Sequence, residues 1–173
     1  IFFSMGKRIK SKNYFDKAIS YYKEALRKYP ASDFVPQTLM FIGVAYFTKH
    51  LYYEALGSFE IGADKYPDNK YTLLMRLGAA EVYYKLKDYK TAIKILQLLK
   101  REYTDPEVAR DAIFRIGDIY YEQKKYEEAI TKYIDAMEVW PEDIDLYPNA
   151  LFNIAESYFQ LKKYKKSLKG YEN

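Results

Sequence analysis

Apolar and polar residues recur along this chain with the spacing of paired amphipathic helices. Between Ile113 and Tyr120, apolar side chains follow an i, i+3, i+4, i+7 order, which places them on one helical face. A second run extends from Tyr126 to Ala136 and stops at Trp140-Pro141, because proline cannot continue the hydrogen-bond ladder of a helix. Only the short polar segment 123–125 separates the two runs, so the sequence predicts an antiparallel helical hairpin.

Five copies of this pattern follow one another without a Gly- or Ser-rich linker. In each copy a small residue on the first helix is followed twelve positions later by another on the second helix, and a large residue comes four positions after that. The small pairs are Gly6/Ala18, Gly43/Ala55, Ala80/Ala92, Gly117/Ala129 and Ala155/Ser167, at steps of 37 or 38 residues. The sequence therefore predicts a single repeat array with copies at about 1–30, 31–67, 68–104, 105–141 and 142–173.

The recurring small residue, the tyrosine three positions later, the second small residue and the aromatic-proline stop resemble the tetratricopeptide repeat. The resemblance implies an all-α fold, a right-handed superhelical solenoid of about five antiparallel helical hairpins. It also implies that the first helices line the concave side. The period exceeds the family's usual length, with extra residues in segments 33–36, 105–108 and 143–148. In this respect the chain is similar to a bacterial long-repeat subgroup that includes the lipoprotein of the outer-membrane β-barrel assembly machinery and the Tol-associated division coordinator. That likeness implies a periplasmic or envelope location, with a cytoplasmic one as the alternative.

Composition and charge narrow the possible partners. The chain has 173 residues, of which 49% are hydrophobic and 18% aromatic, and it contains no cysteine. The formal net charge is +4, but basic residues do not predominate along the whole chain. The net charge is positive in copies 1–30 and 68–104 and negative in copies 31–67 and 105–141. Nucleic acid needs an uninterrupted basic track, so we expect no nucleic-acid partner. No apolar stretch is long enough to span a bilayer, and we expect no membrane insertion.

The sequence offers no converging set of reactive groups. His50 is the single histidine and is expected in a surface turn, while Glu127 and Glu128 lie beside lysines, as on a solvated helical face. The chain carries no metalloprotease, phosphate-loop or nucleophile-elbow motif. We therefore expect no enzyme activity, no cofactor and no metal.

The register set by the resemblance predicts a binding surface on the first helices. An aromatic column is expected at Phe47, Tyr84, Tyr121 and Phe159, and an acidic row one turn before it at Glu81, Asp118 and Glu156. Phe114, Arg115 and Asn153 complete the predicted set of partner-binding residues. Aromatic anchors beside acids suit a peptide or helix with apolar side chains and a few basic ones. The alternative is that these rings only fill gaps between adjacent first helices.

The sequence predicts a protein-binding scaffold, and two other functions stay open. One is an RNA-binding helical repeat, which would need a basic concave surface. The other is a docking or regulatory module of a larger enzyme. Because residues 1 and 173 both interrupt a copy, we expect a fragment whose end faces are apolar and prone to end-to-end self-association.

Overall fold

The computed structural model describes residues 12–103 and 105–164, and these residues form an all-α structure. The elements in chain order are α2 (Lys12–Lys28), α3 (Val35–Thr48), α4 (Tyr52–Lys65), α5 (Thr72–Lys85), α6 (Tyr89–Glu102), α7 (Pro106–Glu122), α8 (Tyr126–Val139), the 3-10 helix η1 (Pro141–Leu146) and α9 (Pro148–Gln160). The predicted first helix of copy one and most of the last second helix lie outside the described residues. The all-α prediction is confirmed.

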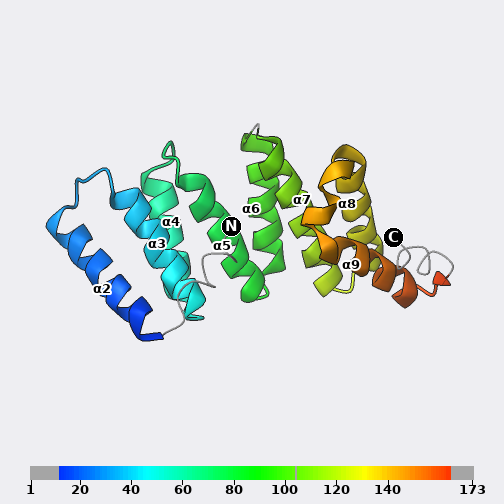
Figure 1. Ribbon diagram of the computed structural model, residues 1–173, viewed down its shortest axis with the longest axis horizontal. Helices are drawn as coiled ribbons and strands as arrows, with labels where there is room; N and C mark the ends of the chain where they lie inside the picture. The colour runs from blue at the N-terminus through cyan, green and yellow to red at the C-terminus, as the bar shows by residue number, and fades with distance from the viewer. Residues whose placement is uncertain (1–11, 104, 165–173) are drawn as a thin grey trace. The chain divides into compact units, whose positions relative to one another are not determined.

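Two compact units divide the chain within α6, one up to Ile95 and one from Leu96 onward. In unit 1, α2 packs on α3, and α3, α4 and α5 pack on one another (Figure 1). In unit 2, α7 packs on α8, and α9 packs on both of them. The predicted hairpins α3–α4 and α7–α8 are thereby confirmed, and in each unit the next first helix stacks on the preceding hairpin. That all five copies form one right-handed array stays a prediction.

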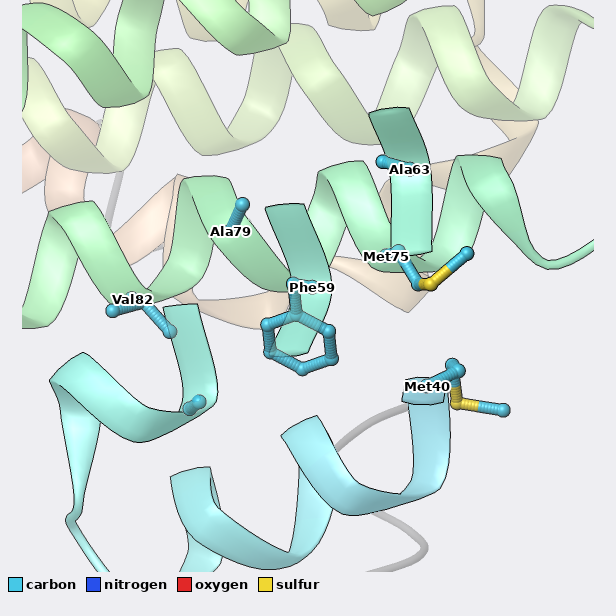
Figure 2. Packing of buried hydrophobic residues seen from close by; sticks show 7 residues of the cluster. Met40, Phe59, Ala63, Met75, Ala79 and Val82 are labelled. Atoms are coloured by element: carbon cyan, nitrogen blue, oxygen red, sulfur yellow. The ribbon is translucent and has the colours of Figure 1, made fainter. Parts of the chain in front are cut away.

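The core of unit 1 is organised around the ring of Phe59. This side chain comes from α4 and is 1% exposed. A Cβ atom on Gly43 of α3 or on Gly78 of α5 would lie only 2.4 Å or 2.7 Å from the ring, so both helices approach it with bare backbone. Figure 2 shows Phe59 among Met40, Ala63, Met75, Ala79 and Val82, which belong to the same buried cluster. One ring therefore fills the space between two consecutive first helices.

The core of unit 2 uses a tyrosine at the matching place. Tyr133 of α8 is 0% exposed, and a Cβ on Gly117 of α7 would meet its Cε1 at 2.6 Å. Ala129 of α8 is also fully buried. The large residue that the repeat pattern places four positions after Ala129 is Tyr133, and it lies between the two helices of the hairpin. The glycine is needed because the ring occupies the space of its missing side chain.

Four hairpin turns share one backbone conformation. His50, Lys87, Lys124 and Lys162 have φ values of 61°, 62°, 59° and 59°, in the left-handed region that glycine usually occupies. At the α7–α8 turn, the Lys124 N–H donates to the Tyr121 carbonyl at 2.8 Å and the Lys125 N–H donates to the Tyr120 carbonyl at 2.9 Å. The same pair of bonds recurs at the other three turns. The four helices α3, α5, α7 and α9 therefore each end in a Schellman motif built without glycine.

The connections between hairpins hold most of the extra residues of the long repeat. Asp105 caps α7, because its carboxylate accepts a hydrogen bond from the Glu107 N–H at 2.9 Å. Before α9 the extra residues form η1, and Arg110 of α7 fastens this segment through an ion pair with Asp143 at 2.5 Å. The insertion is thus packed onto the preceding hairpin.

Candidate functional site

The four rings of the predicted aromatic column each pack against a second aromatic ring across their own hairpin turn. Phe47, Tyr84 and Tyr121 are half-buried, and Phe159 is 51% exposed. The ring pairs, with their centroid separations, are Phe47–Tyr52 at 5.7 Å, Tyr84–Tyr89 at 6.0 Å, Tyr121–Tyr126 at 6.1 Å and Phe159–Tyr164 at 5.6 Å. Part of each ring therefore stabilises its turn, and the remaining part faces solvent.

Unit 1 brings two of these rings onto neighbouring first helices. Phe47 lies near the end of α3 and Tyr84 near the end of α5, and the two helices are in contact. The ammonium group of Lys85 lies 5.1 Å from the centre of the Tyr84 ring and 3.9 Å from the Glu81 carboxylate. Glu81 was predicted to attract a basic partner, and the structure shows that its own helix already supplies one cation.

In unit 2 the other two rings lie on α7 and α9, which are in contact. Tyr121 is half-buried, whereas Phe159 is joined on α9 by Phe152, which is 55% exposed. Between them Glu156 accepts a hydrogen bond from the Gln160 amide at 2.7 Å. The exposed aromatic area of this unit is therefore concentrated on α9.

A polar network surrounds the hydroxyl of Tyr133 in unit 2. This hydroxyl donates to Asp118 at 2.8 Å and accepts from the Asn153 amide at 2.9 Å. Arg115 in turn donates to the other Asp118 oxygen at 3.2 Å. Burial, followed by the negative charge of Asp118, raises the pKa of Tyr133 well above its usual range. Arg115, Asp118 and Asn153 were predicted as partner contacts, and the structure shows that they also hold a core tyrosine in place.

Phe114 was predicted as a partner contact on the surface, and this prediction is wrong because its side chain is buried. It is 2% exposed, and its ring stacks on Tyr147 with centroids 3.8 Å apart and planes 10° apart. Tyr147 immediately precedes α9, and its hydroxyl also accepts a hydrogen bond from Arg110 Nε at 3.0 Å. The repeat pattern gave no indication that Tyr147, a residue of the next connection, covers Phe114.

The described residues offer little for reaction chemistry. Within 12–103 and 105–164, no group of histidine and acidic residues is arranged to hold a metal ion. None of the helices in these two ranges is both long enough and apolar enough to cross a membrane. His50 lies exposed in the α3–α4 turn as predicted, with its Nδ1 3.1 Å from the Tyr52 hydroxyl.

Two family models match the sequence. A tetratricopeptide repeat-like domain matches residues 48–138, and a tetratricopeptide repeat matches residues 109–173. No curated protein matches the chain.

Several solved structures share the fold. MamA 41-end from Desulfovibrio magneticus RS-1 has a TM-score of 0.72 at 19% identity, over 99% of this chain and 89% of that one. A MamA RS-1 ArsTM double mutant has a TM-score of 0.73 at 18% identity, with the same coverage. YrrB, described as a TPR protein with an unusual peptide-binding site, has a TM-score of 0.64 at 21% identity, over 98% of this chain and 80% of that one. At these identities the likeness concerns the fold alone.

Proposed function

We propose that this chain, which belongs to the tetratricopeptide repeat family, is a scaffold. Its first helices bind a peptide or helix of a partner protein. Tetratricopeptide repeat domains generally mediate protein–protein interaction, and such scaffolds are typically non-enzymatic. The observation that carries the proposal is a large aromatic ring at one register position, 47, 84, 121 and 159, in four successive copies.

Partial exposure makes these rings suitable anchors. A ring that packs on one side against its turn is already fixed before a partner arrives, so its immobilisation adds little entropic cost to binding. Large, rigid aromatic side chains are also the residues that most often dominate binding energies. Phe159 is 51% exposed on α9, and Phe152 of the same helix is 55% exposed.

The charges of the same helices favour a protein partner over RNA. Glu81, Asp118 and Glu156 recur at one register position, and the nearby Arg115 donates to Asp118. A polyanion would meet these carboxylates rather than a row of unpaired cations. A partner segment with apolar side chains and some basic ones fits this pattern, with the acids acting mainly on association rate and salt dependence.

We extend the proposal to a bacterial envelope complex, because the long repeat is similar to that of the bacterial envelope subgroup described above. The sequence of the full-length gene product tests this part. A secretion signal with a lipidation site upstream of residue 1 supports it, and an appended catalytic domain would favour the role of an enzyme docking module instead.

Site-directed photo-crosslinking tests where a partner binds. A photoreactive phenylalanine at position 84 or 159 should capture the same partner, whereas the same group at Tyr53, which is 75% exposed on the second helix α4, should not. The double substitution Tyr84→Ala/Tyr121→Ala should weaken binding by about 1–2 kcal/mol for each anchor removed. The matched control is Tyr53→Ala, with the helical content of every variant checked by circular dichroism.

Two results would contradict the proposal. Equal crosslinking from position 53 and from the first-helix positions would place the partner elsewhere. Unchanged affinity in a folded Tyr84→Ala/Tyr121→Ala protein would show that the rings serve only to pack the turns.

A further inference from the structure

Unit 1 has a hollow on the edge formed by its inter-hairpin connections. Its volume is about 300 Å³, and it is lined by Pro30, Ala31, Ser32, Asp33, Pro36, Tyr66 and Asn69. These residues belong mainly to two connections, the one between α2 and α3 and the one between α4 and α5, which Figure 1 shows at the same edge of the unit. We call this hollow the edge pocket.

The edge pocket is separate from the aromatic rings of the first helices. Pro36 lies in the first turn of α3 and Phe47 in its last turn. At 1.5 Å of rise per residue, the eleven residues between these positions place them about 16 Å apart along the helix. A molecule in the edge pocket would therefore occupy a different surface from the one in the proposed function.

Two of the polar side chains in the pocket form hydrogen bonds with the backbone of their own connection. The Ser32 hydroxyl accepts a hydrogen bond from the Phe34 N–H at 3.3 Å, and the side-chain oxygen Oδ1 of Asn69 accepts one from the Tyr71 N–H at 3.0 Å. Among residues 12–103 and 105–164, Asp33 has no hydrogen bond or ion pair through its carboxylate. The Asp33 carboxylate is therefore the charged hydrogen-bond acceptor of the pocket that remains available to another molecule.

Apolar and aromatic residues contribute to the pocket lining and to the adjoining chain. Pro30, Pro36 and Tyr66 form part of the lining. Two large rings in the same connection are exposed, Tyr29 at 65% and Phe34 at 71%. Such rings attract cations through their faces and pack against the methylene stems of long basic side chains.

From this arrangement we propose that the edge pocket binds a lysine or arginine side chain of a partner protein. A cationic head would form a charge-assisted hydrogen bond with Asp33, and its apolar stem would lie against the prolines and Tyr66. The edge pocket gives the scaffold a second contact point beyond its first helices.

Titration with two blocked amino acids tests this proposal. The probes are N-acetyl-arginine methylamide and its neutral isostere N-acetyl-citrulline methylamide, and binding is followed through the backbone amide NMR signals of the protein. The arginine probe should produce saturable shifts at residues 31–36 and 66–69. Asp33→Asn should weaken this binding by about tenfold, which is the size expected when one charge-assisted contact is lost.

Asp64→Asn is the matched control, because it removes the same charge from an exposed position of α4 outside the pocket lining. It should leave the affinity for the arginine probe unchanged. The proposal is overturned if the arginine probe shifts no pocket signals, if the citrulline probe binds equally well, or if Asp33→Asn binds the arginine probe like the unchanged protein. None of these outcomes bears on the rings at positions 84 and 121.

Discussion

Two glycine-to-alanine substitutions should change stability in opposite directions. Gly117 lies in α7, where an added Cβ would be 2.6 Å from Cε1 and 2.8 Å from Cδ1 of Tyr133. Gly57 lies in α4, where an added Cβ would have no heavy atom within 4 Å. Both positions are helical, so both substitutions gain the same preference of alanine over glycine, about 1 kcal/mol.

The difference between the two variants isolates the steric clash at Gly117. Tyr133 cannot move aside easily, because it is fully buried and its hydroxyl is held by Asp118 and Asn153. Overpacking of this kind costs about 2–3 kcal/mol. We expect Gly117→Ala to lose about 1–2 kcal/mol of unfolding free energy and Gly57→Ala to gain about 0.5–1 kcal/mol.

Urea unfolding followed by far-UV circular dichroism measures both changes. Combining Gly117→Ala with Tyr133→Leu should cost less than the sum of the single substitutions, because the smaller side chain leaves room for the new methyl group. The reasoning is refuted if Gly117→Ala is as stable as Gly57→Ala, or if the costs of Gly117→Ala and Tyr133→Leu simply add.

Three further substitutions test other features of the structure. Lys124→Gly should raise the unfolding free energy by about 0.5–1 kcal/mol in urea titrations, because its φ of 59° suits glycine better than lysine. Ser157→Ala should raise the melting temperature through a gain of about 1 kcal/mol, since the serine hydroxyl is buried without a hydrogen-bond partner in the described part of the chain. Tyr133→Phe should make the loss of stability at high pH shallower. The raised pKa of Tyr133 means that the unfolded state loses this proton first, so stability falls as pH rises above about 10. Urea unfolding over a pH series measures this slope, and an unchanged slope would contradict the assignment.

The sequence predicted those features that depend on residues close together in the chain. The second helix of the hairpin was expected from the run Tyr126 to Ala136 and the stop at Trp140-Pro141, and α8 spans Tyr126–Val139, because apolar spacing and a following proline are local signals. The burial of Tyr133 and Ala129 was predicted in the same way, from their register relative to Gly117. Helical periodicity fixes which face of a helix is inside even when the neighbouring helix is unknown.

Contacts between copies could not be predicted in this way. Phe114 was expected on the surface, and it is buried by Tyr147, which lies 33 residues later in a connection whose path the repeat pattern does not specify. The left-handed residues at the turns were also missed, because lysine at three of the four positions gives no signal comparable to glycine. The edge pocket depends on two connections meeting, and therefore on the packing of whole hairpins.

The ring of Phe59, placed between Gly43 and Gly78, makes the unfolding of neighbouring hairpins in unit 1 cooperative. If the helix α5 detaches, one face of this ring becomes exposed to water although its own hairpin is still folded. Separating one copy from the next therefore costs free energy even before either hairpin unfolds. In unit 2 the next copy is linked in the same way, because Ala150 and Ile154 of α9 belong to the buried cluster that contains Tyr133. Asn153 of the same helix also donates a hydrogen bond to the Tyr133 hydroxyl. Detachment of α9 would therefore expose apolar surface and remove a hydrogen bond from a buried hydroxyl, so unit 2 should also resist partial opening.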